Sequence, residues 1–421
     1  MGSSPACRID MFKFLHTADL HLGKVLHEYP LKNDQEYFLD QIAGITTDKS
    51  FSALLIAGDI YDRSIPSVDA VSMFSTFLGA LKKNRPDLEI LVISGNHDSA
   101  PRLGFAKELL TELGIHLVTD PEDSTVPIIV GECAFFLLPF LAPDSLKKTP
   151  REGEPAELLT SQKALAEEAA LRLNGALNRL SGNEIRYKVL GAHLFTRDSK
   201  EAGSERVFLG GAEQVDVGQF SGFNYIGLGH LHRCQPAGIN AWYSGSPIAY
   251  SFKESPHKKC PIQTPFEDSE YGKFVLAPVL TEQGTEVSRI PIQPLRKLYS
   301  LSGTFDYFDT ESGKALEPVK NDYLELVLDD ITLQDNAMSR LRKHFPHLLT
   351  INQGKAFDVD RRLPEQESLY GEDVANRTVK EDFADFLIQL YGTSNPGFLS
   401  ECERFDRTLE DIEKEEKNGL L

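Results

Sequence analysis

Residues 12–24 decide the fold, and their sequence is FKFLHTADLHLGK. A short run of mostly apolar side chains, Phe12–Ala18, is followed at once by Asp19, Leu20 and His21. Nearly continuous apolar runs of this length are typical of strands buried on both faces of a sheet. In an extended chain, residues two apart point the same way, so Asp19 and His21 can bind one metal ion together.

The same type of apolar run recurs through the first 250 residues. Five further strands are predicted, at Ala53–Ala57, Glu89–Ser94, Ala134–Pro139, Lys188–His193 and Asn224–Leu228. Helical patterns separate them, with one helix expected to begin at Ser67 and others expected over 101–113 and 161–180. Strands that alternate with helices predict an α/β protein with a mixed or parallel sheet.

Four of these later strands also end in Asp, Asn or His side chains. The segments are Gly58-Asp59-Ile60-Tyr61-Asp62, Gly95-Asn96-His97-Asp98, Gly191-Ala192-His193 and Gly227-Leu228-Gly229-His230-Leu231-His232. Each motif alone is weak, because a lone His after a strand is usually structural and Gly-Asp recurs by chance. Together they are a strong signal, since open α/β sheets bind their ligands at the carboxyl ends of the strands.

These residue types suit the displacement of a phosphoryl group. Two divalent ions about 3.5–4 Å apart can hold the attacking and the departing oxygen, and one carboxylate must bridge them. Asp59 is the natural candidate for the bridge. A mixture of imidazole nitrogen with carboxylate and amide oxygen suits Mn, Fe or Zn better than Mg. If Asn96 is a ligand, the neighbouring His97 can protonate the leaving group or steady the phosphate.

Composition limits the classes of protein to which the chain can belong. Its 421 residues, of which 41% are hydrophobic, are enough for two or three globular domains. We expect no membrane span, because no uncharged apolar run reaches about 18 residues. The first ten residues lack the apolar region of a secretory signal. The five cysteines are few and scattered, which favours a reducing compartment, and we expect the cytoplasm.

The polar clusters resemble the calcineurin-like metallophosphoesterase family, whose pattern is Asp-x-His, Gly-Asp, Gly-Asn-His-Asp/Glu, His and Gly-His-x-His. All five blocks occur in order from Asp19 to His232. Their surroundings resemble the SbcD branch of that family, the nuclease subunits of double-strand-break repair. The stretches that carry this closer resemblance are 16–24, 58–63, 95–99, 227–232 and 243–247, and the similarity is looser beyond residue 253.

The resemblance implies two metal sites that share a ligand. The first ion would be held by Asp19, His21, Asp59 and His232, and the second by Asp59, Asn96, His193 and His230. By the same resemblance His97 would act on the scissile phosphate. Asp62 occupies a position at which archaeal relatives carry a second active-site His, so it is a candidate for an auxiliary catalytic role. The expected cofactor is a pair of divalent ions, Mn(II) above all.

The resemblance also implies an architecture. We expect a four-layer α/β/β/α sandwich over 12–293, a small α/β cap domain over 294–355 and a helical tail over 356–421. The cap would face DNA, and the tail would bind the coiled coil of an SbcC-like ATPase subunit.

The implied activity is exonuclease cleavage of double-stranded DNA ends and endonuclease cleavage near hairpins, controlled by ATP on the partner. A homodimer within a heterotetramer is implied as well. The net charge of -19 is a poor match to DNA, so metal ions and a partner would have to supply positive charge.

Other functions remain open at this point. A nucleotidase, a cyclic-nucleotide phosphodiesterase or a protein phosphatase of the same fold would share the metal motifs. The long segment after His232 favours the nuclease, because a compact small-molecule esterase needs no cap or tail. A scaffold that has lost its ligands is disfavoured, since every ligand position is filled. A simple DNA-binding module is disfavoured by the acidity and the lack of a basic recognition helix.

Overall fold

The computed structural model describes residues 11–149, 158–180, 184–196, 199, 214–255, 260–261, 272–311, 316–330 and 336–353. All of them belong to the first of two compact units, Met1–Ala356. The tail expected over 356–421 lies outside the described residues. Among the described helices, none has the length and apolar character that crossing a membrane would require.

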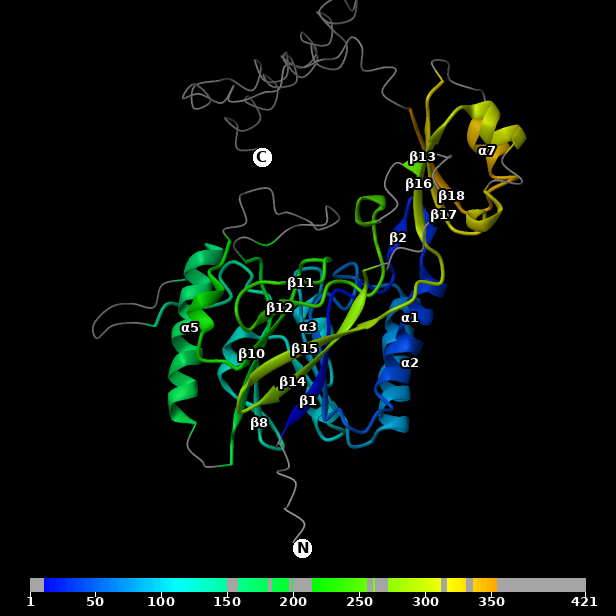
Figure 1. The fold of residues 1–421 in the computed structure, drawn as a ribbon. Helices are drawn as coiled ribbons and strands as arrows, with labels where there is room; N and C mark the ends of the chain where they lie inside the picture. The colour runs from blue at the N-terminus through cyan, green and yellow to red at the C-terminus, as the bar shows by residue number, and fades with distance from the viewer. Residues whose placement is uncertain are drawn as a thin grey trace, which may run out of the picture. The chain divides into compact units, whose positions relative to one another are not determined.

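The first of two six-stranded sheets contains the opening strand of the sequence (Figure 1). Its order is β15-β14-β1-β4-β5-β6. The strands are β1 (Phe12–Thr17), β4 (Ala53–Ala57), β5 (Glu89–Ile93), β6 (Ile115–Val118), β14 (Phe274–Thr281) and β15 (Gly284–Pro291). The first four are parallel, whereas β14 pairs antiparallel with both β1 and β15. The sheet is therefore mixed, with its antiparallel edge supplied by the hairpin β14–β15.

The second sheet has the order β11-β12-β10-β9-β8-β7. Its strands are β7 (Ile128–Val130), β8 (Cys133–Leu138), β9 (Tyr187–His193), β10 (Tyr225–Gly229), β11 (Gln235–Pro236) and β12 (Ala241–Tyr243). The central strands β8, β9, β10 and β12 are parallel, and the two edge strands are antiparallel. The parallel strands of each sheet present their carboxyl ends at one edge, which is where the polar clusters of the sequence lie.

The two sheets pack face to face through a core of large apolar side chains. Phe14 of β1 and Phe135 of β8 meet edge to face with ring centroids 5.3 Å apart. Gly191 and Gly227 allow the close approach, because a Cβ atom at either position would lie 2.7 Å from the Leu55 side chain. Each fully buried side chain of this kind contributes about 1.5–3 kcal/mol to folding.

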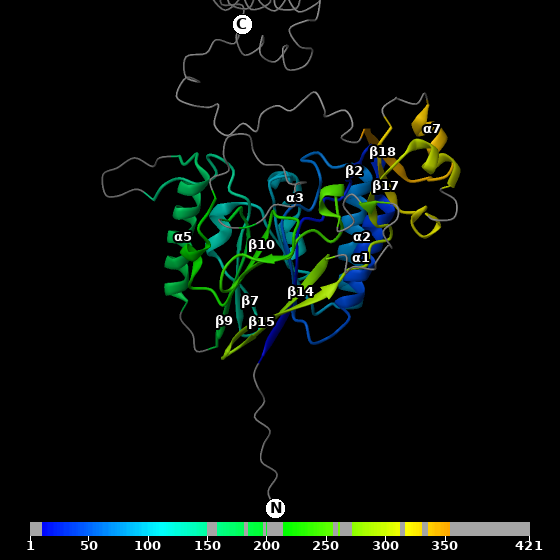
Figure 2. The same cartoon turned by 45° about the horizontal axis from the view of Figure 1, so that its top comes forward.

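Helices cover the outer faces of both sheets. The first sheet packs on α1 (Lys32–Ile45) and α2 (Val68–Asn84), and the second packs on α5 (Gln162–Arg179). Figure 2 shows α1 and α2 together on one side of the strands and α5 on the other. The predicted α/β/β/α sandwich is therefore confirmed.

Two of the predicted helices begin where the sequence indicates, and a third prediction differs from the structure. Ser67 and Ser161 cap α2 and α5, each accepting a hydrogen bond of 3.2 Å from the backbone N–H three residues on. The single helix expected over 101–113 is wrong. The chain instead forms α3 (Ala100–Leu103) and α4 (Lys107–Thr111). The break comes from Ala106, whose φ of 60° is left-handed and incompatible with a continuous helix.

A third sheet has the order β13-β16-β17-β18. Three of its strands lie in the region expected to form the cap, 294–355, whereas β13 lies before it. Its elements are β13 (Cys260–Pro261), β16 (Leu298–Gly303), β17 (Tyr323–Leu328), β18 (Leu348–Gln353) and the helix α7 (Ala337–Leu341). All three strand pairings are parallel, and a separate apolar core lies beneath them. Tyr323 joins this unit to the sandwich, since its hydroxyl donates to Asp34 Oδ2 of α1 at 2.6 Å.

The remaining described elements are short. They are the hairpin β2 (Val25–Leu26) and β3 (Tyr29–Pro30), the 3-10 helices Pro121–Thr125, Val217–Phe220, Phe252–Glu254 and Glu317–Val319, and a π-helical turn at Tyr307–Glu311.

Candidate metal centre

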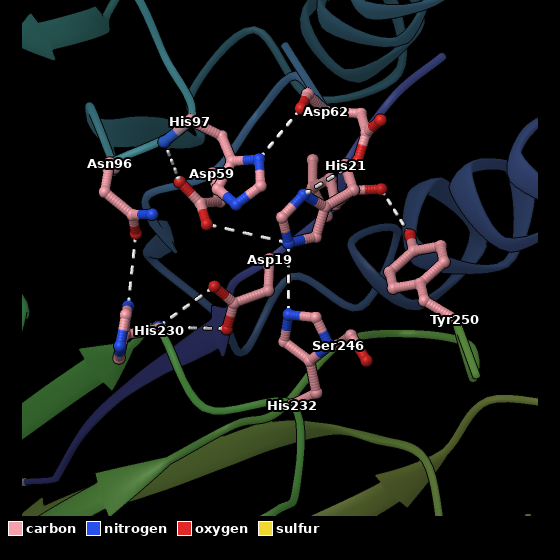
Figure 3. Close-up of polar contacts among 12 residues, drawn as sticks. Asp19, His21, Asp59, Asp62, Asn96, His97, His230, His232, Ser246 and Tyr250 are labelled. Atoms are coloured by element: carbon pink, nitrogen blue, oxygen red, sulfur yellow. Dashed lines mark hydrogen bonds and ion pairs between the residues drawn. The ribbon is translucent and has the colours of Figure 1, made fainter. Parts of the chain in front are cut away.

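The seven side chains predicted as metal ligands meet at the carboxyl ends of five strands from both sheets. Asp19 and His21 follow β1, Asp59 follows β4, Asn96 follows β5, His193 ends β9, and His230 and His232 follow β10. Figure 3 shows how Asp19, His21, Asp59, Asn96, His230 and His232 lie around one another. The predicted residues are therefore brought together, with each sheet supplying part of the set.

The backbone geometry around Asp19 and His21 differs from the expected extended chain. The strand β1 ends at Thr17, and both residues are left-handed, with φ of 55° and 43°. Such conformations cost about 1–3 kcal/mol for residues other than glycine and cluster at functional sites. Backbone hydrogen bonds of 3.0 Å hold them, from Asp19 N to the Gly58 carbonyl and from His21 N to the Asp59 carbonyl. The two side chains are thus gathered by a turn, and the reasoning from strand alternation was wrong.

Two of the glycines before the clusters are required by space. A Cβ atom at Gly95 would lie 2.1 Å from Asp59 Oδ1, and one at Gly229 would lie 1.9 Å from the Ala57 carbonyl oxygen. Atoms cannot approach so closely without a shift of the backbone. The glycines therefore allow neighbouring strand ends to meet at the site.

The first cluster consists of Asp19, His21 and His232, whose candidate ligand atoms lie within 4.8 Å of one another. The Nε2 atoms of His21 and His232 are 3.1 Å apart. The other ring nitrogen of each histidine lies nearest a carboxylate, at 3.6 Å from Asp62 Oδ1 for His21 and 3.5 Å from Glu254 Oε1 for His232. A proton on Nδ1 of both rings would leave the two Nε2 lone pairs facing each other, which is the arrangement that a metal ligand needs.

The second cluster repeats this arrangement around Asn96. His193 Nδ1 donates to the Ala57 carbonyl at 2.9 Å, which leaves Nε2 as an acceptor 3.0 Å from Asn96 Oδ1. His230 Nδ1 lies 3.1 Å from the same amide oxygen. Burial lowers the pKa of His193, although the nearby Asp59 raises it, so the ring is neutral near pH 7. Two acceptors in contact repel each other unless a cation lies between them.

Asp59 lies between the two clusters. Its Oδ2 atom is 3.6 Å from His21 Nε2 and 3.7 Å from His193 Nε2. Facing lone pairs, imidazole nitrogens and carboxylate oxygens together form a donor set that fits a divalent transition-metal ion. The geometry is compatible with a metal site, and Asp59 is placed where it can contact both clusters.

His97 and Asp62, the predicted catalytic residues, contact each other through the main chain. His97 Nδ1 donates to the Asp62 carbonyl oxygen at 2.8 Å, and the His97 amide donates to Asp59 Oδ1 at 2.9 Å. The Asp62 carboxylate turns elsewhere, accepting from Lys24 Nζ at 2.7 Å. The backbone of Asp62 therefore orients His97, while its side chain faces Lys24 and His21.

Asp98 closes the loops that follow β4 and β5. Its carboxylate accepts from the backbone N–H groups of Gly95, Ile60 and Tyr61 at 2.9, 3.0 and 2.9 Å. Burial and the charge of Asp59 raise the pKa of Asp98 to about 7, against these three donors. A cation beside Asp59 would reduce that repulsion, so this carboxyl group also fits a metal-bound site.

The structure adds supporting residues that the sequence motifs did not indicate. Tyr250 packs its ring against His21 and His232, with centroids 5.3 and 5.8 Å away, and its hydroxyl donates to the Leu20 carbonyl. Gln35 donates to the His21 carbonyl at 2.7 Å and accepts from Gly23 N at 2.9 Å.

Two further supporting residues, Glu254 and Lys273, form a buried ion pair beside His232. Burial would raise the pKa of Glu254, but Lys273 and His232 hold it well below its usual range. No motif spacing marks either residue, because only the folded chain brings them to the cluster.

Comparison with known proteins agrees with this geometry. Residues 12–234 match the calcineurin-like phosphoesterase family. The D subunit of the nuclease SbcCD from Staphylococcus epidermidis is 30% identical over 344 residues, which are 81% of this chain and 85% of that protein. Its counterpart in Staphylococcus saprophyticus is 26% identical over 387 residues, which are 91% of this chain and 95% of that protein.

Among solved structures, a dimetal phosphatase from Danio rerio covers 67% of this chain at 12% identity, but its TM-score of 0.38 supports no inference. The family match covers more than half of the chain, and the relatives match over most of their length. The chain therefore belongs to the calcineurin-like phosphoesterase family and, within it, to the SbcD branch of nuclease subunits.

Proposed function

We propose that this chain is a metal-dependent DNA nuclease that works as the SbcD component of an SbcCD-type complex. The observation that carries the proposal is the pair of clusters of nitrogen and oxygen ligand atoms on either side of Asp59, at the edge where the two sheets meet. Membership of the SbcD branch supports DNA as the phosphodiester that is cut.

In this proposal each cluster holds one divalent ion. Asp19, His21, Asp59 and His232 would hold the first, and Asp59, Asn96, His193 and His230 would hold the second. Two bound ions, which we propose are Mn²⁺, would supply positive charge to the phosphodiester and would lower the pKa of a water molecule so that it can act as the nucleophile. The mixed nitrogen and oxygen ligands favour Mn²⁺ over Mg²⁺.

The side chains of the protein then position the substrate and move protons. Because His97 Nδ1 is held by the Asp62 carbonyl, Nε2 is the nitrogen left to contact the phosphate. In its protonated form Nε2–H can donate to the deoxyribose oxygen as the P–O bond breaks, which leaves a hydroxyl group on one fragment of the cut strand and a phosphate on the other fragment. Asp62 would take part indirectly, by orienting His97 and His21.

DNA binding by so acidic a chain needs help from a partner. With 63 acidic and 44 basic residues, the subunit alone opposes the approach of a polyanion. We propose that an SbcC-like ATPase carries most of the DNA contacts, in a heterotetramer with two copies of each chain. Such a complex would act on the chromosome in the cytoplasm. Equal duplex affinity of the isolated subunit and the complex at matched salt would contradict this assignment.

The decisive experiment supplies the full chain with Mn²⁺ and a labelled linear duplex, with and without its ATPase partner. A bis-aryl phosphodiester is assayed in parallel, with His97→Ala and Asp59→Ala as controls. Loss of duplex ends that disappears in both variants supports the proposal. Hydrolysis of the small diester without any DNA cleavage, even with the partner present, would identify a small-molecule phosphodiesterase instead.

A further inference from the structure

A buried ion pair lies directly behind the first cluster of the metal centre. Glu254, in the 3-10 helix Phe252–Glu254, and Lys273, just before β14, have side chains that are 1% and 6% exposed. Their charged groups contact each other, and both also contact His232. Buried charges are expensive to desolvate, and such pairs often contribute little net stability. The position of the pair beside a candidate ligand therefore points to a role beyond stability.

The contacts of this pair fix both ends of His232. Lys273 Nζ donates to the His232 carbonyl oxygen at 2.9 Å and to Ser246 Oγ at 2.8 Å, so it holds the backbone of the ligand. Glu254 Oε1 lies 3.5 Å from His232 Nδ1 and holds the ring. The carboxylate is itself anchored, because the same oxygen accepts from the Tyr250 amide at 3.0 Å.

The rigidity of the loop supports the same conclusion. Gly245 has a φ of 74°, and a Cβ atom there would lie 2.7 Å from the His232 carbonyl oxygen. Ser246 N also donates to that carbonyl, at 3.3 Å. The backbone of His232 is thus enclosed by Gly245, Ser246 and Lys273, and only the ring remains to be oriented.

We propose that Glu254 and Lys273 are positioning residues, which set the tautomer and orientation of His232 so that its Nε2 lone pair faces the first metal site. Glu254 accepts the Nδ1 proton, and Lys273 neutralises Glu254 and fixes the ligand's carbonyl. The inference rests on the proposed metal centre. It concerns the first cluster, because the contacts of both residues described above run to His232.

The test measures Mn²⁺ binding to the full chain by calorimetry and by the electron paramagnetic resonance of bound and paired Mn²⁺. Partners of this kind typically alter metal affinity by about 10- to 100-fold. Glu254→Gln keeps the size of the side chain but removes the charge. We expect it to lower the affinity for one of the two ions by that factor and to leave the affinity for the other within about threefold of the wild-type value. The spin coupling of paired ions should then appear only at higher Mn²⁺ concentration.

Two further variants separate positioning from folding. Glu168→Gln removes a similarly buried carboxylate that pairs with Arg172 on α5 and contacts none of the metal ligands, so Mn²⁺ affinity should not change. Glu254→Gln with Lys273→Met leaves no unpaired charge, so stability should recover while the weak site stays weak.

Three outcomes overturn the proposal. The first is a wild-type Mn²⁺ affinity in Glu254→Gln, and the second is an equal loss of affinity for both ions. The third is recovery of the weak site in the double variant, which would mean that Glu254 only balances Lys273. Failure of the wild-type protein to bind Mn²⁺ at all would instead refute the proposed metal centre.

Discussion

His193 Nε2 and Asn96 Oδ1 lie 3.0 Å apart although both atoms are hydrogen-bond acceptors. His193 Nδ1 donates its hydrogen bond to the Ala57 carbonyl, so Nε2 has no proton to offer to Asn96. The repulsion between these two atoms in the metal-free protein should be measurable as lower stability, because a bound cation converts the repulsion into attraction.

We therefore expect Mn²⁺ to stabilise the protein strongly. A ligand present at 100 times its Kd raises the free energy of unfolding by about 2.7 kcal/mol per site. Asn96→Ala should melt no lower than the wild type in EDTA, because the repulsion is gone, yet melt lower in Mn²⁺. Thermal melts in the two buffers test this crossover. A melting temperature that ignores Mn²⁺ would count against a metal centre at these residues.

Substitution of His97 should lower the rate of phosphodiester hydrolysis much more than substitution of Asp62. His97→Ala removes the group that would protonate the leaving oxygen, and general acids contribute about 10²–10⁴-fold to rate. Asp62→Asn keeps the main-chain carbonyl that orients His97, and we expect a smaller loss of about 10-fold through the lost support of His21. Turnover of a bis-aryl phosphodiester in Mn²⁺ measures both. Equal losses would show that the Asp62 carboxylate takes part in the chemistry itself.

Gly95 and Gly79 form a matched pair for alanine substitution. A Cβ atom at Gly95 would overlap Asp59 Oδ1, so Gly95→Ala should displace Asp59 and abolish Mn²⁺ binding even in protein that still folds. Gly79 lies within α2 with no atom within 4 Å of the added carbon. Gly79→Ala should therefore stabilise the protein by about 1 kcal/mol with unchanged metal affinity. Chemical unfolding and Mn²⁺ titration distinguish the two variants. Normal Mn²⁺ binding by Gly95→Ala would contradict the expectation that a Cβ atom at this position displaces Asp59.

His16 should make the protein sensitive to acid. Burial lowers its pKa from 6.5 to about 3, although a backbone contact with Leu228 raises it slightly. Between these pH values the unfolded chain binds the extra proton, so stability falls as pH falls, by about 1.4 kcal/mol per pH unit. Compared with His16→Leu in EDTA, the wild type should lose about 2 kcal/mol more between pH 7.5 and pH 5. Parallel pH profiles of urea unfolding for the two proteins would refute this.

Tyr323 should contribute to the attachment of the cap region. Its hydroxyl donates to the buried Asp34 carboxylate, which also lies 3.4 Å from Arg296 Nη1. Tyr323→Phe leaves that carboxylate short of a partner, which costs about 1–3 kcal/mol. Tyr37→Phe, at an exposed position of α1, serves as the control. Equal free energies of unfolding for the two variants would show that the contact contributes nothing.

The sandwich was predictable because its central strands are buried on both faces. Ala53–Ala57 was predicted with the bounds that the structure gives it. The edge strand β11 was not predicted, since a strand of two residues has no periodicity to detect. The break in the 101–113 helix was also hidden, because nothing in the sequence marks Ala106 as left-handed.

The metal centre was predictable only in its chemistry. Asp, Asn and His after successive strands identify the candidate ligands, but Asp19 and His21 reach the cluster through left-handed turns that no motif specifies. Glu254 and Lys273 were beyond reach for a different reason. Lys273 arrives beside His232 because β14 pairs with β1, and that pairing joins parts of the chain that are more than 250 residues apart in sequence.

That late pairing also bears on how the protein is made. The candidate ligands are spread from Asp19 to His232, and the strand that borders β1 is not synthesised until after residue 273. A growing chain on the ribosome therefore lacks His230 and His232 at first, and afterwards it still lacks β14, the strand that pairs with β1 in the first sheet. The full set of candidate ligands and the complete first sheet are therefore both present only late in the synthesis of the sandwich.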